Sequence, residues 1–249
     1  MSTRDNSYSA VMARSNEIMK ASVGMDYDDY ISSPIAFDYE RMMRDTGYSH
    51  EEIVKIQTET KVGNTPLFEL KRLTEAVRKI SEPGKGARIL LKDEAANASG
   101  SFKARRASVS VFEAAKKGFK GVVAATSGNY GAAVASQANQ RGLKCTVIQE
   151  VYDSRGVGQP EIIEKGRKCE AYGAEVIKLT VGPELFYIHL LTLEQTGFFN
   201  ASLYTPFGIR GVETLGTEIV EQVRARYCQD PDAVIITQAG GGNLTGTAR

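Results

Sequence analysis

The sequence predicts an α/β protein in which helices cover both faces of parallel β-sheets, that is, doubly wound sheets, organised as two domains. From Arg88 onward, short apolar runs alternate with helix-like stretches of ten or more residues, which is the pattern of parallel βαβ units. Glycine-rich turns follow two of the apolar runs, where ligands bind in such sheets. The length of 249 residues suffices for one or two domains with a real core.

The elements can be justified in order along the chain. Residues 1–60 show no strand alternation, so we expect an arm with short helices, one beginning near Ser49, where Ser49 and Glu52 have capping-box spacing. A turn at Asn64 and Pro66 leads into an apolar strand. Apolar periodicity and turn residues then predict strands at 88–92, 121–126, 144–149, 175–179 and 233–238, and helices at 73–80, 101–117, 130–141, 159–173, 183–197 and 212–227.

The last predicted unit is a strand at 233–238, a glycine-rich turn and the first residues of a helix. A βα unit without its full helix would leave one face of the sheet bare. We therefore expect that further residues follow Arg249 in a longer protein and that the C-terminal part of the fold is missing here.

Composition argues against several classes of function. A net charge of +1 gives no electrostatic case for binding nucleic acid or a membrane surface, and no apolar run approaches the roughly 20 residues that span a bilayer. The start of the chain has no apolar signal-peptide core. Cys145, Cys169 and Cys228 lack CxxC or metal-site spacing, so we expect reduced thiols, no metal site and a cytoplasmic protein.

The two histidines give poor support for histidine-based catalysis. His50 follows the predicted cap at Ser49 and is interpreted as a surface residue. His189 lies in an apolar helical stretch and is interpreted as structural.

The first chemically informative turn is SGSFK, which ends at Lys103 and opens the helix at 101–117. A lysine at a helix N-terminus faces an unfavourable dipole, which lowers its pKa and favours the neutral amine that attacks a carbonyl. Lys103 is therefore a candidate for bonding to an aldehyde. A solvated surface lysine is the alternative at this point.

A second turn, TSGNYG, follows the strand at 121–126 and opens the next helix. Its backbone N–H groups can hold an anion such as a substrate carboxylate, and the Asn129 side chain can hydrogen-bond a ring oxygen. An ordinary helix cap is the alternative.

The third turn, GGGN at 240–243, lies between a predicted strand and a helix, where open N–H groups can cradle phosphate. It matches neither a Walker A loop nor the full GxGxxG spacing, and a plain tight turn is the alternative. A nucleophilic lysine, a carboxylate site and a phosphate site together point to pyridoxal phosphate, which carries an aldehyde and a phosphate.

The ordered motifs VGNTPLFEL, KDEAANASGSFKARRA, TSGNYGAAVA, GAEVIKL and GGGNLTG resemble the tryptophan-synthase-beta-like, fold type II pyridoxal-phosphate enzymes over about residues 61–249. The resemblance implies that Lys103 bonds to the cofactor and that Asn129 contacts its ring oxygen. It also implies that Ser127, Gly128 and Tyr130 lie near the substrate carboxylate. The implied phosphate loop consists of Gly240, Gly241, Gly242, Asn243 and Leu244.

Further stretches, among them FDYERMMRDTGYS, EVYDSRGVGQPEIIEKGRKCEAYGAEV and FNASLYTPFGIRGVETLG, resemble the beta subunits of 2-amino-4-oxopentanoate thiolases. This likeness implies an acyltransferase of ornithine degradation that works with a separate alpha subunit. It would cleave 2-amino-4-oxopentanoate with coenzyme A into acetyl-CoA and alanine. The expected partners are the alpha subunit, coenzyme A and a small amino-acid substrate, within an oligomer.

Two alternatives share the same cofactor residues. One is a lyase or β-replacement enzyme of the threonine dehydratase, threonine synthase or cysteine synthase type. The other is a non-catalytic subunit that binds pyridoxal phosphate or regulates a partner.

The resemblance also implies a division of the chain. Residues 1–97 would begin a large cofactor domain, 98–203 would form a small α/β domain, and 204–249 would return to the large one, with the cofactor between them. Arg105 and Arg106 could face an anionic ligand. We favour the alternative that they contact solvent or form ion pairs. Cys145 and Cys169 are expected in the core.

Overall fold

A computed structural model describes residues 4–202 and 205–249. Its central feature is a four-stranded sheet of order β7-β6-β5-β8, in which all neighbouring strands are parallel. The sheet confirms the predicted α/β class and three predicted strands. The fourth strand, β8, was not predicted because two residues are too few to show periodicity. The bounds are β5 (Gly121–Ala125), β6 (Lys144–Tyr152), β7 (Glu175–Thr180) and β8 (Phe199–Asn200).

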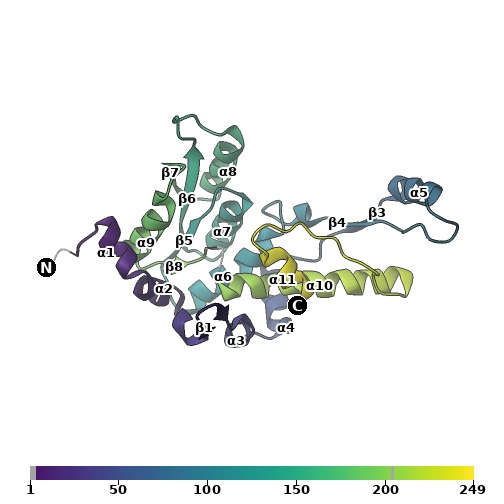
Figure 1. The fold of residues 1–249 in the computed structure, drawn as a ribbon, viewed down its shortest axis with the longest axis horizontal. Coiled ribbons are helices and arrows are strands. Elements are labelled where there is room, and N and C mark those ends of the chain that lie inside the picture. Colours follow the sequence, from purple (N-terminus) through teal and green to yellow (C-terminus); the bar gives the residue numbers. More distant parts are fainter. Residues whose placement is uncertain (1–3, 203–204) are drawn as a thin grey trace.

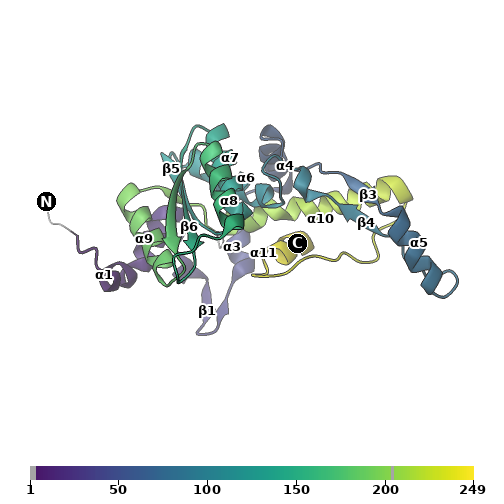
Figure 2. The ribbon, with the colours of Figure 1, turned by 90° about the horizontal axis from the view of Figure 1, so that it is seen from above.

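Helices cover both faces of this sheet (Figures 1 and 2), as the doubly wound prediction requires. On one face, α6, α7 and α8 pack around Val122, Ala124 and Val147; on the other, α1, α2 and α9 pack around Val123 and Ile148. Successive residues of a strand point to opposite faces, which explains the division. The helices are α1 (Tyr8–Ala13), α2 (Ser15–Val23), α6 (Lys103–Lys116), α7 (Asn129–Gln140), α8 (Pro160–Ala171) and α9 (Glu184–Thr196).

A long helix, α10 (Pro206–Tyr227), extends away from the sheet (Figure 1). Two of its glycines allow close packing. A side chain at Gly211 would meet the carbonyl oxygen of Arg105 in α6 at 2.0 Å, and one at Gly216 would meet that of Thr247 in α11 (Gly242–Ala248) at 2.1 Å. Glycine at these positions therefore brings α6 and α11 against the same helix.

Beyond the sheet, β3 (Leu67–Glu69) and β4 (Leu90–Lys92) pair antiparallel and lead to α5 (Lys71–Ile80) at the far end of the molecule (Figure 1). The strand predicted at 88–92 therefore exists but does not belong to a parallel βαβ unit.

The strand predicted at 233–238 is wrong, because the structure has no strand or helix there. Ile235 is 99% exposed, and Val234 is exposed as well. An apolar run becomes a strand only when its backbone groups pair with a neighbouring strand, and within the described residues none pairs with this segment.

The N-terminal region contains the short helices predicted for it. The capping box is confirmed: Ser49 Oγ accepts a hydrogen bond from the Glu52 N–H at 3.2 Å, and the Glu52 carboxylate accepts one from the Ser49 N–H at 2.7 Å. The bounds are Tyr27–Tyr30 (a 3₁₀ turn), β1 (Ile31–Ser33), β2 (Ala36–Phe37), α3 (Tyr39–Arg44), α4 (His50–Glu59) and a second 3₁₀ turn at Glu94–Ala96.

None of the helices in the described ranges combines the length and the apolar character needed to cross a bilayer.

Candidate functional site

Lys103 is the first residue of α6 and lines a cavity of about 500 Å³. Its Nζ lies 4.1 Å from the centre of the Phe102 ring. Burial lowers the pKa of Lys103 to about 8, and the neighbouring charge of Arg106 adds to this effect. The direction of the pKa shift agrees with the prediction, but its causes are burial and the Arg106 charge, and the expected helix dipole is not among them.

The glycine-rich turn lines the same cavity through Gly240, Gly241, Gly242 and Asn243. Lys103 and this turn lie 137 positions apart in the sequence, and the packing of α6 and α11 on α10 brings them together. Gly241 has φ of +82°, a backbone conformation that glycine adopts without strain. A Cβ at Gly242 would come within 3.1 Å of Ile209 Cδ1, a tight contact that would require the Ile209 side chain to shift. Leu244, the last residue of the predicted loop, is exposed and is not a lining residue.

Arg106 also lines the cavity, although only 5% of the residue is exposed. Its guanidinium carbon lies 5.0 Å from the centre of the Tyr130 ring and 3.9 Å from the position that a Cβ would occupy at Gly242. Arg106 is thus placed between the first turn of α7 and the glycine-rich turn. Of the environments favoured for Arg106 from the sequence, solvent and an ion pair, the structure excludes solvent, because α7, α10 and the glycine-rich turn cover the side chain.

The TSGNYG turn leads into α7, which begins at Asn129, and no side chain of the turn caps the helix. Ser127 and Asn129 are exposed, and the Gly128 N–H donates to Thr126 Oγ1 at 3.1 Å. Residues 127–130 do not line the cavity that holds Lys103. However, α6 and α7 pack side by side, and the contact between Arg106 and Tyr130 shows that their first turns adjoin.

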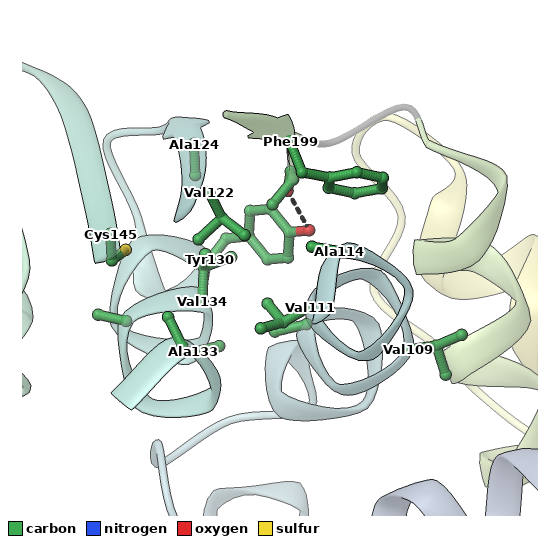
Figure 3. Close-up of a cluster of buried hydrophobic side chains, with 14 of the residues drawn as sticks. Val109, Val111, Ala114, Val122, Ala124, Tyr130, Ala133, Val134, Cys145 and Phe199 are labelled. Atoms are coloured by element: carbon green, nitrogen blue, oxygen red, sulfur yellow. Dashed lines mark hydrogen bonds between the residues drawn. The ribbon is translucent and has the colours of Figure 1, made fainter. Parts of the chain in front are cut away.

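The side chain of Tyr130 is fully enclosed in the hydrophobic core, among residues such as Val111, Val122 and Phe199 (Figure 3). Its hydroxyl donates a hydrogen bond to the carbonyl oxygen of Ala201. Tyr130 can therefore serve an adjacent ligand through its backbone N–H at the helix start.

Arg105 lies at the centre of a buried ion network whose partners the sequence did not identify. Its guanidinium is 0% exposed and contacts Glu94 at 2.8 Å and Glu218 at 2.9 Å. Glu218 also accepts hydrogen bonds from the N–H groups of Asn64 and Thr65 and pairs with Lys92. The ion-pair prediction for Arg105 is thus confirmed. The sequence pattern could not identify Glu218 as a partner of Arg105, because the two residues lie 113 positions apart and meet only in the folded chain.

The remaining candidates are structural. His189 is buried in α9, and its Nε2 lies 3.1 Å from Asn200 Oδ1, while burial lowers its pKa to about 4. Cys145 and Cys169 are buried, as expected, and burial raises the pKa of Cys145 to about 12 and that of Cys169 to about 11.

The cavity fits pyridoxal phosphate on two observations. It offers an amine with a lowered pKa and, in the same lining, a turn of three glycines whose backbone a phosphate can approach. In addition, the buried Asn243 Oδ1 has no hydrogen-bond partner among the residues the structure describes, so it can accept one from a ligand.

Comparisons with known proteins agree with this chemistry. Residues 58–249 match the family described as "Pyridoxal-phosphate dependent enzyme". Two curated relatives, both described as 2-amino-4-ketopentanoate thiolase beta subunits, are 67% identical over 246 residues (unknown prokaryotic organism) and 65% identical over 247 residues (Acetoanaerobium sticklandii). Each alignment covers 99% of this chain but only 52% and 53% of the relative, so the chain spans about half their length.

More distant relatives share the fold. A threonine synthase of a Bacillus species is 30% identical over 186 residues, covering 74% of this chain and 47% of the relative. Among solved structures, a threonine deaminase from T.th. gives a TM-score of 0.65 at 30% identity, covering 81% of this chain and 60% of that one. A pyridoxal-5'-phosphate-dependent aspartate racemase gives a TM-score of 0.64 at 26% identity, with 78% and 56% covered.

Proposed function

The chain belongs to the family of pyridoxal-phosphate-dependent enzymes, and from this premise we propose that it serves as the cofactor-carrying beta subunit of a 2-amino-4-oxopentanoate (2-amino-4-ketopentanoate) thiolase. The observation that carries the proposal is the identity of 67% and 65% over 99% of the chain to two such subunits. The cavity with Lys103 and the glycine-rich turn supports the cofactor part of the proposal.

The proposed reaction balances without a redox partner. The bond between the methylene carbon and the keto carbon breaks, and the coenzyme A sulfur bonds to the acetyl carbon. The thiol proton ends on the methylene carbon, which becomes the methyl group of alanine. Acetyl-CoA and alanine are the products, and a separate alpha subunit belongs to the proposed assembly.

In this proposal Lys103 has two roles. Its amine would hold the cofactor through the aldehyde, and with substrate bound the same amine would accept the proton from the amino-bearing carbon and return it. When bound, pyridoxal phosphate supplies an electron sink that stabilises negative charge on the neighbouring carbons. The pKa of about 8 suits proton transfer in both directions, because both forms of the amine are populated near neutral pH.

Other residues would bind and orient. The backbone N–H groups of Gly240–Asn243 would hold the phosphate, while Asn129 would contact the ring oxygen. Ser127, Gly128 and the backbone of Tyr130 would face the substrate carboxylate. The packing of α6 on α7 and the contact between Arg106 and Tyr130 support this assignment, although residues 127–130 do not themselves line the cavity.

The domain division expected from the sequence forms part of the proposal, with 98–203 as the small domain. Every strand of the parallel sheet lies within that range. Helices α1 and α2 pack on α9 and β8, so the beginning of the 1–97 segment would cover the small domain. The predicted boundary at 203–204 lies outside the described residues.

A product assay tests the function. The chain is mixed with pyridoxal phosphate, the alpha subunit, 2-amino-4-oxopentanoate and coenzyme A, and we expect acetyl-CoA and alanine in equal amounts. Ammonia and a keto acid would instead identify a lyase and contradict the proposal.

Replacement of Lys103 tests the assigned residue. Lys103→Ala should abolish both turnover and borohydride trapping of the cofactor. Lys55→Ala, an exposed position on α4, should retain both. Full turnover by Lys103→Ala would refute the assignment.

A further inference from the structure

The described wall of the Lys103 cavity carries three charged residues, Lys103, Arg106 and Arg249, and all three are basic. Arg249 pairs with Glu40 and Glu213, which offset its charge. No acidic side chain is present among the described lining residues. The cavity therefore presents an excess of positive charge, which suits an anionic ligand.

The position of Arg106 is fixed by its surroundings. The Tyr130 ring lies on one side, with its centre 5.0 Å from the guanidinium carbon. A Cβ at Gly208 of α10 would lie 3.6 Å from Nε, and one at Gly242 would lie 3.9 Å from the guanidinium carbon. A long side chain that is already ordered loses little further entropy when it binds a ligand.

The proximity to Gly242 indicates which anion Arg106 binds. The glycine-rich turn offers backbone N–H groups, which are uncharged donors, whereas a cofactor phosphate carries up to two negative charges. A guanidinium is planar and binds phosphate through two parallel hydrogen bonds. The Arg106 guanidinium, which lines the cavity and lies beside Gly242, is therefore placed to add a charged donor to this turn.

We propose that Arg106 supplies the charged part of the phosphate site, so that the cofactor phosphate is held by the guanidinium together with the backbone of residues 240–243. This inference rests on the proposed cofactor function and adds a binding residue to it. Arg106 would also assist capture of the cofactor, because its charge favours the neutral, reactive form of the free Lys103 amine.

The test compares pyridoxal phosphate with pyridoxal, which has the aldehyde but no phosphate. Dissociation constants for both are measured from the visible absorption of the lysine-bound aldehyde in the unchanged chain, Arg106→Gln and Arg106→Lys. We expect Arg106→Gln to weaken pyridoxal phosphate about 10- to 100-fold and pyridoxal less than about threefold, since charge-assisted hydrogen bonds are lost only with the phosphate. Arg106→Lys, which keeps the charge but not the planar fork, should give an intermediate loss.

The design separates this role from general damage to the fold. Both dissociation constants are measured on the same variant. A smaller folded fraction therefore affects both compounds equally and leaves the ratio of the two constants unchanged. Arg141→Gln is the matched control, because Arg141 is also largely buried and lies 4.9 Å from the Phe112 ring, but it does not line the cavity. Its ratio should equal that of the unchanged chain.

Three results would overturn the proposal. Equal weakening of both compounds would make Arg106 a packing residue. Unchanged binding of both, with a raised KM for the amino-acid substrate or coenzyme A in the assembled enzyme, would assign it to a substrate anion. If the unchanged chain bound neither compound, the cofactor proposal itself would be refuted. This outcome is seen without any variant, so it is distinguishable from failure of the Arg106 proposal.

Discussion

At the scale of single residues, the lowered pKa of Lys103 has a measurable consequence. A pKa of about 8 leaves roughly one amine in ten neutral at pH 7, whereas an ordinary lysine would have only about one in three thousand neutral. The rate at which the chain captures pyridoxal phosphate should therefore rise with pH and level off above about 8. Stopped-flow absorbance across pH 6 to 10 (roughly the range in which lysines of this kind titrate) measures this profile.

Arg106→Gln provides the control for this profile. Removing a neighbouring positive charge makes the ammonium form less unfavourable, so the midpoint should move to higher pH. A midpoint that stays near 10.5, the ordinary value, in the unchanged chain would contradict the burial of Lys103 that the structure describes.

Glu218 is a residue whose loss should lower stability, because it pairs with Arg105 and Lys92. Burial alone would raise its pKa, but Arg105 and Lys92 hold the pKa below its ordinary value. Glu218→Gln would leave these two cations with Glu94 as their remaining carboxylate. We expect the free energy of unfolding to fall by about 3 kcal/mol in urea titrations at pH 7.

Two comparisons check the Glu218 prediction. Glu221→Gln, on the exposed side of the same helix, should change stability by less than about 0.5 kcal/mol. Because the pKa of Glu218 is lowered in the folded state, its stabilisation is complete above its unfolded pKa of 4.5 and is lost as pH falls through the folded value. The difference between Glu218→Gln and the unchanged chain should therefore shrink on acidification, and a constant difference would argue against a charge effect.

At the scale of elements, the contact between α10 and α11 positions the glycine-rich turn. A methyl group at Gly216 would lie 2.1 Å from the Thr247 carbonyl oxygen, which is backbone and cannot rotate away. Gly216→Ala should therefore displace α11 and weaken pyridoxal phosphate binding by about tenfold or more, since a displacement of about 1 Å already disrupts a binding site. Titration followed by visible absorbance measures the loss.

Thr217→Ala is the matched variant for this contact, because Thr217 is the next residue of α10 and is exposed. Its affinity should equal that of the unchanged chain. Equal affinity in Gly216→Ala would mean that the cofactor does not depend on the position of α11.

At the scale of the whole molecule, an exposed segment links the end of α10 at Tyr227 to the glycine-rich turn that begins at Gly240. Residues 234–236 have no secondary structure, and thermolysin, which cuts before apolar residues, should cleave there. Bound pyridoxal phosphate should slow this cleavage, because it holds the glycine-rich turn that follows. Ile35, 98% exposed in the turn between β1 and β2, is the internal control, and its cleavage should not change. Equal protection at both positions would indicate inhibition of the protease.

The sequence alone determined the parts of this protein that depend on local pattern. Apolar periodicity located β5, β6 and β7 and the helices around them, and the Ser49–Glu52 spacing located a helix start, because these features depend on neighbours a few residues away. The motifs around Lys103 and residues 240–243 identified the cofactor chemistry, which the family match confirms.

Only the tertiary structure decided what depends on distant contacts. It joined Lys103, Arg106 and the glycine-rich turn in one cavity, buried Arg105 against Glu218, and enclosed the side chain of Tyr130 in the core. It also left residues 233–238 without a strand, although their pattern favours one. The physical reason is the same in each case: burial, ion pairing and strand pairing depend on which surface packs opposite a residue, and a local pattern does not specify that surface.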